Sequence, residues 1–177
     1  MRDKKEIRAF VRNTLKSITV DERLLRSDNI AKQLLSLDEL YSARVIALFV
    51  SLPDEPDTAL LLNELSNRCR VVVPRIGGDT MEFYDYCEQT LSSGSYGILE
   101  PSDGEAVAPR DIDIMIVPGV AFTIEGHRMG RGKGYYDKYM SREGFRALKI
   151  GICLAPQILE WLPCEPHDIK MDIIIQA

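Results

Sequence analysis

One stretch of the sequence, residues 126–138, concentrates groups that could bind phosphate. It places four glycines, five basic residues, two tyrosines and one acid in thirteen positions. Glycine tolerates positive φ and leaves main-chain N–H groups accessible to a ligand. Arg128, Arg131 and Lys133 are interleaved with the glycines, so the stretch predicts a site for a polyphosphate. A helix would then begin with residues 135–140, directly after the glycines, and its N-terminal dipole would add to the attraction for an anion.

The stretch fits neither of two common phosphate-binding motifs. A Walker A loop needs G-x-x-x-x-G-K-[ST], but Gly132 and Lys133 precede a glycine, and His127 stands where the first glycine should be. For the dinucleotide motif G-x-G-x-x-G the third glycine comes one residue early. A surface loop with solvated charges is the plain alternative. The aromatic and acidic residues at 135–137 favour a ligand site, since they offer stacking and metal ligation beside the loop.

The composition bounds the class of protein. With 177 residues and 45% hydrophobic content, we expect one domain, residues 1–177, that buries roughly 70% of its unfolded surface. The four cysteines form no C-x-x-C pair, which favours reduced thiols and a cytoplasmic location. No apolar run reaches the roughly 18 residues of a membrane span, and the net charge of −5 argues against a nucleic-acid partner. We expect a monomer that acts on small molecules.

Two amphipathic helices are expected at the N-terminus. Two capping pairs, Asp3 with Glu6 and Thr19 with Glu22, indicate where these helices begin. Each pair precedes apolar residues at helical spacing. The apolar residues are Ile7, Phe10, Val11, Leu15 and Ile18 in the first helix, and Leu24, Leu25, Ile30, Ala31, Leu34 and Leu35 in the second. The two helices would form a hairpin.

The first helix carries a basic stripe. Lys4, Arg8 and Arg12 recur every four residues and so lie on one face. Such a stripe is usually a solvated surface. Beside a phosphate-binding loop it becomes a candidate second wall of the same site.

Short apolar runs indicate the strands of a buried sheet. They cover residues 45–50, 71–74, 112–117, 148–154 and 173–175, with a shorter strand at 81–86 after a turn at 77–79 and loops at 92–97 and 104–110. Their alternation with helices predicts an α/β fold of three layers, in which a mostly parallel sheet has helices on both faces.

A second candidate ligand loop follows the first strand. Two prolines forbid regular structure in residues 51–58, and Asp57 or Thr58 would cap a helix that runs to about Asn67. Open α/β sheets bind ligands at the carboxyl ends of their strands, and the glycine stretch also follows a strand. Glu55 could be a solvated acid, or a carboxylate that accepts the adjacent N–H donors of a pterin-like ring.

Three motifs together resemble one enzyme family. Residues 130–137, GRGKGYYD, resemble the signature of the 5-formyltetrahydrofolate cyclo-ligases, and the K-x-x-x-R pattern at Lys4 and Arg8 and the E-x-x-T pattern at Glu55 and Thr58 match it in the same order. The resemblance spans nearly the whole chain and agrees with the three-layer fold. One departure is Thr123, where relatives commonly have aspartate.

The resemblance implies roles for individual residues. For catalysis these are Lys4, Arg131 and Lys133. For ATP binding they are Lys4, Lys5, Arg8, Arg128, Met129, Gly130, Arg131, Gly132, Lys133, Gly134, Tyr135 and Tyr136. For folate binding they are Val50, Glu55, Arg131, Gly132, Lys133, Gly134 and Tyr135. For Mg²⁺ they are Asp137 and Asp172.

The implied reaction is the ATP-dependent cyclisation of 5-formyltetrahydrofolate to 5,10-methenyltetrahydrofolate, with Mg²⁺ as cofactor. Phosphorylation of the formyl oxygen would make it a good leaving group, and catalysis of such a transfer is chiefly positioning and charge neutralisation. Two other classes stay open, a sugar-phosphate isomerase-like enzyme and a non-catalytic folate- or nucleotide-binding module.

Overall fold

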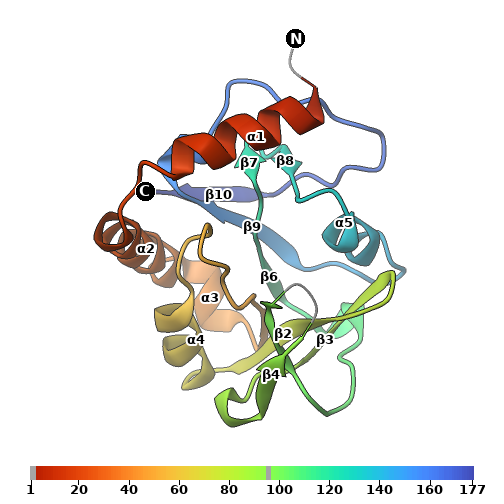
Figure 1. Cartoon of the computed structure of the whole chain (residues 1–177). Helices are drawn as coiled ribbons and strands as arrows, with labels where there is room; N and C mark the ends of the chain where they lie inside the picture. Colours follow the sequence, from red (N-terminus) through yellow and green to blue (C-terminus); the bar gives the residue numbers. More distant parts are fainter. Residues whose placement is uncertain (1–2, 95–96) are drawn as a thin grey trace.

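A computed structural model of the chain describes residues 3–94 and 97–177 (Figure 1). The helices are α1 (Lys4–Leu15), α2 (Val20–Leu35), α3 (Asp38–Ser42), α4 (Ala59–Ser66) and α5 (Tyr135–Met140). The strands are β1 (Val45–Ala47), β2 (Arg70–Gly77), β3 (Thr80–Asp85), β4 (Leu91–Ser93), β5 (Leu99–Pro101), β6 (Ile114–Val117), β7 (Ala121–Phe122), β8 (Arg128–Met129), β9 (Leu148–Cys153) and β10 (Ile173–Gln176). None of the helices in the described ranges is long and apolar enough to cross a membrane.

The main sheet has six strands in the order β10-β9-β6-β1-β2-β3. All neighbours pair in parallel except β2 and β3, which form an antiparallel hairpin, so the predicted mostly parallel sheet is confirmed. From β1 the chain moves outward to β2, whereas from β6 it moves the other way to β9. The strand order therefore reverses between β1 and β6, and open α/β sheets bind ligands outside the carboxyl ends of strands at such a reversal.

The alternation of side chains along each strand creates the three layers. Ile46 and Ile116 point into a cluster with α2 and α4, whereas Ala47 and Met115 point into a second cluster that includes Tyr139 of α5. Figure 1 accordingly shows α2 and α4 on one side of the sheet and α5 on the other. Because both faces are covered, the strands read as continuous apolar runs rather than as alternating ones.

The two N-terminal helices begin at the predicted caps. Asp3 and Glu6 form a capping box, and the Thr19 hydroxyl accepts the N–H of Glu22. The helices follow one another directly but dock in different places, α1 beside β7, β8 and residues 155–157, and α2 on α4 and β10. Three residues expected on their apolar faces are instead exposed, namely Phe10 (40%), Leu24 (42%) and Leu25 (63%). Each helix touches the body of the protein along a narrower stripe than its apolar residues cover.

Several boundaries differ from the prediction. β1 ends at Ala47 rather than at Val50, and β6 begins at Ile114 rather than at Ile112. The run at 71–74 extends through Pro74 to Gly77, because pairing with β3 continues to the end of the hairpin. Part of the predicted loop at 92–97 is a strand, because β4 pairs with β5 in a small antiparallel sheet. Residues 95–96 of that predicted loop lie outside the described residues.

Candidate active site

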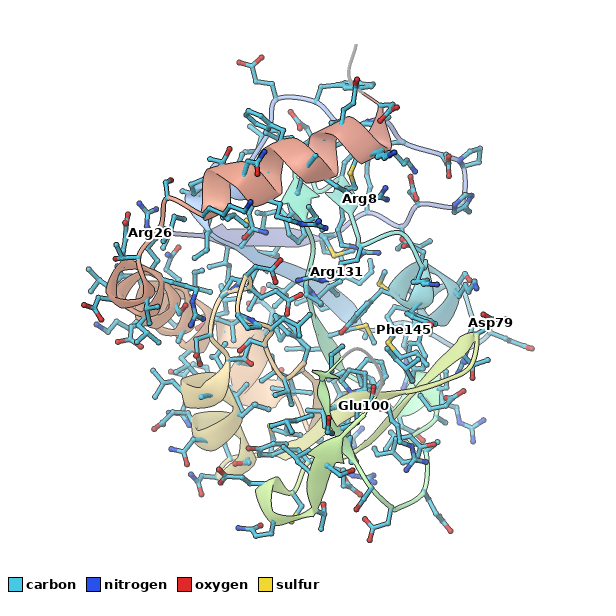
Figure 2. All side chains as sticks on the ribbon, viewed as in Figure 1. Arg8, Arg26, Asp79, Glu100, Arg131 and Phe145 are labelled. Atoms are coloured by element: carbon cyan, nitrogen blue, oxygen red, sulfur yellow. The ribbon has the colours of Figure 1, made fainter. Side chains whose placement is uncertain are left out.

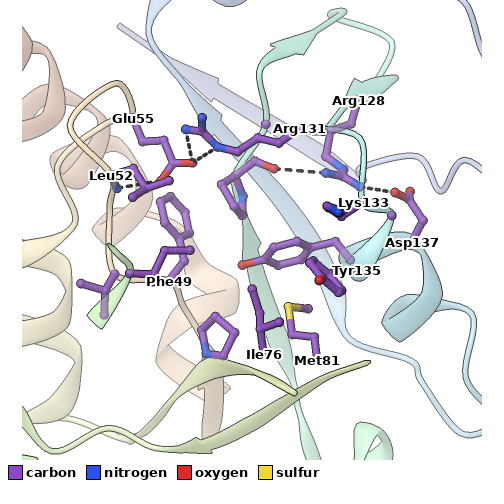
Figure 3. Close-up of a pocket in the computed structure, with 18 residues that line it drawn as sticks. Phe49, Leu52, Glu55, Ile76, Met81, Arg128, Arg131, Lys133, Tyr135 and Asp137 are labelled. Carbon is purple, nitrogen blue, oxygen red and sulfur yellow. Dashed lines mark hydrogen bonds and ion pairs between the residues drawn. The ribbon is translucent and has the colours of Figure 1, made fainter. Parts of the chain in front are cut away.

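A cavity of about 420 Å³ opens at the carboxyl ends of β1 and β6 (Figure 3). It lies where the loop after β1, the β2–β3 hairpin and the glycine stretch meet. The predicted site residues that line it are Val50, Glu55, Arg128, Gly130, Arg131, Lys133, Gly134, Tyr135, Tyr136 and Asp137. Two loops that are distant in the sequence thus contribute to one pocket, as the strand-end rule predicts.

The Glu55 carboxylate is held in place inside this pocket. Its side chain is only 8% exposed, and its Oε2 accepts the main-chain N–H of Leu52 at 2.9 Å. Its Oε1 accepts Nε and Nη2 of Arg131 at 3.3 and 3.0 Å. Figure 3 shows these bonds as dashed lines that join Glu55 to Leu52 and Arg131. Glu55 is therefore a buried and oriented carboxylate, and the solvated-acid alternative is wrong.

Asp54, the residue before Glu55, binds the same guanidinium. Its two carboxylate oxygens accept Nη1 and Nη2 of Arg131 at 3.1 and 2.6 Å. Burial alone would raise the pKa of Asp54, but the hydrogen bonds and charge of Arg131 outweigh it and lower that pKa. Burial alone would lower the pKa of Arg131, but the hydrogen bonds and charges of Asp54 and Glu55 outweigh it and raise that pKa. Sequence reasoning did not identify Asp54 as part of this group.

The glycine loop presents unpaired donors. Gly132 and Gly134 adopt φ of +108° and +68°, as expected for a loop that exposes its amides, whereas Gly130 has no positive φ. Within the described part of the chain, the main-chain N–H groups of residues 131–134 reach no acceptor. Successive amides of this kind form a concave site for an anion. Helix α5, which follows the loop, has only six residues. The loop amides and basic side chains therefore account for an attraction to an anion better than the N-terminus of this helix does.

Lys133 is the available cation of this loop. It lines the cavity and is exposed, and its ammonium group pairs with no acidic group of the described residues. An ammonium group needs little reorganisation to meet a phosphate when no carboxylate holds it. Lys133 is therefore a cation of the cavity lining that is available to an anion.

Arg128 is buried rather than presented to solvent. Its side chain is 3% exposed, and Nη2 donates to Asp137 Oδ2 at 2.6 Å while Nη1 donates to the Pro118 carbonyl at 3.3 Å. Its Nε has no hydrogen-bond partner. Arg128 therefore fixes Asp137 at the wall of the cavity. We expected Arg128 to be presented freely to a phosphate, but its guanidinium is buried and paired instead.

Helix α1 reaches the glycine loop through Arg8, which donates Nε to the Gly130 carbonyl at 2.9 Å. Figure 2 shows Arg8 and Arg131 beneath this helix. Neither Arg8 nor Lys4 lines the cavity, and Lys4 pairs with Asp168 and Glu165 at 3.1 and 3.2 Å. Burial opposes the charge on Lys4, but these two acids outweigh it and raise its pKa.

The remaining predicted ATP residues occupy different positions. Met129 is buried in a cluster with Ile7 and Val11 of α1, so its side chain docks that helix. Lys5 is exposed and does not line the cavity. Gly132 also lies outside the lining residues, beside the Arg8 guanidinium. The basic helix and the glycine loop are adjacent, as predicted, because Arg8 binds the Gly130 carbonyl, but no described residue of α1 lines the cavity.

The two predicted metal ligands lie in different surroundings. Asp137 lines the cavity, with Oδ2 bound to Arg128 and Oδ1 accepting the Ile169 N–H at 3.1 Å. Asp172 does not line the cavity, and its Oδ2 accepts both the main-chain N–H and the ammonium of Lys149. One group of three potential ligands occurs in the described residues, Glu165, His167 and Asp168. The Lys4 ammonium already lies between Glu165 and Asp168.

The apolar wall of the pocket was not identified from the sequence. Ile76 and Met81 face each other across the β2–β3 hairpin and line the cavity together with Phe49 and Leu52. Tyr135 lies above them in Figure 3 and donates its hydroxyl to the Gly78 carbonyl at 3.1 Å. The pocket thus combines an apolar wall with one buried acid, Glu55, and the cations Arg128, Arg131 and Lys133. The available signal was the position of Phe49 near the end of the predicted strand 45–50 and of Leu52 just after it.

Thr123, the departure from the family pattern, closes the turn between β7 and β8. Its hydroxyl accepts the His127 N–H at 3.3 Å, and its carbonyl accepts the Gly126 N–H at 3.0 Å. It is buried and outside the cavity lining. A hydroxyl supplies the acceptor that this turn requires.

Comparison with known proteins gives a consistent result. Residues 1–177 match the sequence model of the 5-formyltetrahydrofolate cyclo-ligase family. A probable 5-formyltetrahydrofolate cyclo-ligase of Schizosaccharomyces pombe is 33% identical over 192 residues, covering 97% of this chain and 94% of the relative. The mouse 5-formyltetrahydrofolate cyclo-ligase is 25% identical over 187 residues, covering 97% and 92%.

The fold agrees with solved structures. An NMR structure of 5,10-methenyltetrahydrofolate synthetase from Aquifex aeolicus superposes with a TM-score of 0.88 at 34% identity, covering 98% of this chain and 89% of that one. A 5,10-methenyltetrahydrofolate synthetase from Mycoplasma pneumoniae gives a TM-score of 0.81 at 25% identity, covering 98% of both chains.

Proposed function

The chain belongs to the 5-formyltetrahydrofolate cyclo-ligase family, and from this premise we propose that it converts 5-formyltetrahydrofolate and ATP into 5,10-methenyltetrahydrofolate, ADP and phosphate. The observation that carries the proposal is the shared pocket in which a fixed carboxylate, Glu55, lies across from a free cation, Lys133, and unpaired amides at 131–134. Such a pocket suits a reduced pterin at one end and a phosphate chain at the other.

For folate, the apolar wall and Glu55 supply complementary contacts. A carboxylate has about four lone-pair positions, and the described bonds to Leu52 and Arg131 leave part of that capacity for N–H donors of the pterin. Val50 and Tyr135 would complete the walls around the ring. The ring buries apolar faces while its polar edge meets the acid, a division that small-molecule pockets commonly use.

For ATP, the amides of residues 131–134 and the cations Lys133, Arg131 and Arg8 would surround the phosphates. The formyl oxygen attacks the γ-phosphorus and ADP leaves. N10 of the folate then attacks the formyl carbon, the C–O bond breaks, phosphate departs and N10 gives up its proton. No nucleophilic side chain is required, so these residues contribute by holding the two substrates in line and by stabilising charge on the transferring group.

We include Mg²⁺ as the ion that accompanies ATP, because it neutralises phosphate oxygens and keeps several waters while taking one or two carboxylates from a protein. Asp137 fits as one such ligand, since it lines the cavity and its two described bonds leave acceptor capacity on both oxygens. Asp172 is hydrogen-bonded and ion-paired to Lys149, so its position does not support a role as a second Mg²⁺ ligand. Lys4, tied to Asp168, would act on the outer phosphates from the end of α1.

We further propose that residues 1–177 form a single domain that acts as a monomer on small molecules, without nucleic acid or a membrane, in the cytoplasm. The four free cysteines suit a reducing compartment. One relative, from Arabidopsis thaliana, is described as mitochondrial.

The direct test mixes the protein with 5-formyltetrahydrofolate and Mg-ATP and follows the absorbance of methenyltetrahydrofolate together with ADP. We expect stoichiometric formation of both, and neither product when ATP is replaced by a non-hydrolysable analogue. Binding of both ligands without turnover would instead indicate a non-catalytic module. Isomerisation of a sugar phosphate without ATP consumption would indicate the other class that the sequence left open.

A further inference from the structure

Asp54 occupies a position that the proposed reaction does not explain. It projects from the loop after β1 and accepts Nη1 and Nη2 of Arg131 with its two oxygens. This two-point geometry is the strong form of an arginine–carboxylate pair. The neighbouring residue Glu55 binds the same guanidinium, so two consecutive acids hold one arginine.

The donor inventory of Arg131 shows the consequence. A guanidinium has five N–H donors. Glu55 takes the Nε hydrogen and one on Nη2, and Asp54 takes the other on Nη2 and one on Nη1. One hydrogen on Nη1 is left. As it stands in this structure, Arg131 therefore has no free edge with two parallel donors for a phosphate.

Asp54 and Glu55 differ in how readily they could release the Arg131 guanidinium. The Glu55 side chain is 8% exposed and also binds the Leu52 amide, whereas Asp54 is 41% exposed and binds Arg131 alone among its described side-chain partners. Returning an exposed carboxylate to water costs little compared with unpairing a buried one. A second cation, Arg12 of α1, lines the same small hollow as Asp54 and Arg131 and would still attract the released carboxylate.

We propose that Asp54 is a positioning residue for Arg131, which it holds beside Glu55 in the nucleotide-free protein and releases to the phosphates of ATP. Asp54 and ATP then compete for one edge of the guanidinium, so Asp54 lowers the affinity for nucleotide while keeping Arg131 oriented. The inference rests on the proposed function because it takes ATP as the competing ligand.

The test is Asp54→Asn, which keeps the shape of the side chain and removes its charge. We expect Mg-ATP to bind about fivefold more tightly in titration calorimetry, the size expected when competition from a partly exposed ion pair is lost. The KM for ATP should fall by the same factor, with the KM for 5-formyltetrahydrofolate near the wild-type value. Asp54→Glu retains the charge and should keep ATP affinity near that of the wild type.

Asp57→Asn is the matched control. Asp57 is on the same loop and pairs with Arg23 at 3.7 Å rather than with Arg131, so its variant should bind ATP as the wild type does. If the Asp54 pair only joins two loops, Asp54→Asn would lower the melting temperature without tightening ATP binding, and the proposal would be wrong. If Asp54→Asn does not fold, Asp54→Ser also removes the charge and carries the same expectation.

The calorimetric result also separates the two proposals. Tighter ATP binding by Asp54→Asn in a protein without cyclo-ligase turnover would support the role of Asp54 and contradict the proposed reaction. Turnover in the wild-type protein with unchanged ATP affinity in Asp54→Asn would contradict the role of Asp54 alone.

Discussion

Arg131 and Glu55 are 76 residues apart in the sequence, yet Nη2 of Arg131 lies 3.0 Å from Oε1 of Glu55. The contact joins the loop proposed to bind folate to the loop proposed to bind ATP. It arises because these loops lie above β1 and β6, which are adjacent in the sheet. Two substrates bound to these loops would therefore be neighbours, as a direct phosphoryl transfer between them requires.

Lys133→Ala should lower kcat on the order of 100-fold. Lys133 lines the cavity without an acidic partner in the described residues, and removing a cation aimed at developing charge costs about 3 kcal/mol of transition-state stabilisation. Lys138→Ala is the control, since Lys138 is exposed on α5 and outside the cavity lining. The measurement is the steady-state rate of methenyltetrahydrofolate formation by both variants. A near-normal kcat for Lys133→Ala would show that Lys133 is not part of the site.

The sequence was sufficient to predict the six-stranded sheet, the helices α1, α2, α4 and α5, and the two loops that line the cavity, but not α3 or the small β4–β5 and β7–β8 sheets. These features depend on local patterns, because caps, apolar runs and glycine positions act over a few residues. The step from loops to one pocket needed only the rule that parallel strands place their carboxyl ends on one edge. Glu55 and Lys133 thus lie in one cavity, as expected.

The partners of each charge could not be predicted in this way. Arg128, Arg131 and Lys133 are similar in sequence context, but the structure buries the first, pairs the second with two acids and leaves the third exposed. The difference depends on how α5 and the loop after β1 pack around the glycine stretch. Met129 is a further example, because only the docking of α1 makes it a core residue.

Glu55→Gln should raise the KM for 5-formyltetrahydrofolate by about 5- to 10-fold, the range expected when a hydrogen bond to a charged acceptor becomes a neutral one. The Leu52 amide and Arg131 would also lose a charged partner. Glu64→Gln is a suitable control, because Glu64 is on α4 and pairs with exposed Arg68. An unchanged folate KM in Glu55→Gln would contradict the assignment of the folate end of the pocket.

Asp137→Asn should raise the Mg²⁺ concentration needed for half-maximal activity and should also destabilise the protein. The Asp137–Arg128 pair has side-chain exposures of 14% and 3%, and leaving a buried cation without its partner costs about 3 kcal/mol. Asp172→Asn is the comparison, since it loses a partly exposed contact with Lys149. Magnesium titrations of both variants test the two predicted ligands separately. Equal shifts would place both carboxylates on the ion, and an unchanged Asp137→Asn titration would remove Asp137.

Gly126→Ala should cost more stability than Gly78→Ala, although both glycines have positive φ, of +90° and +60°. A Cβ at Gly78 meets no atom within 4 Å, so that variant should lose about 1 kcal/mol from backbone strain alone. A Cβ at Gly126 would overlap the Met171 carbonyl, a main-chain atom that cannot rotate away. Urea unfolding should show a loss of about 3 kcal/mol or more for Gly126→Ala. Equal losses would mean that residues 126 and 171 are not in close contact.

The cysteines should differ in their reaction with a thiol reagent. Burial raises the pKa of Cys153 to about 12, and only the thiolate reacts appreciably. Cys87 is exposed at the surface. At pH 8 we therefore expect Cys87 to react with a disulfide reagent before unfolding, and Cys153 only after it. Because the solvent-shielded thiol stays protonated in the folded state, raising the pH to 9 should still leave Cys153 unreactive. The Cys87→Ser variant provides the control, and rapid labelling of Cys153 in that folded variant would contradict the packing of β9 against both layers.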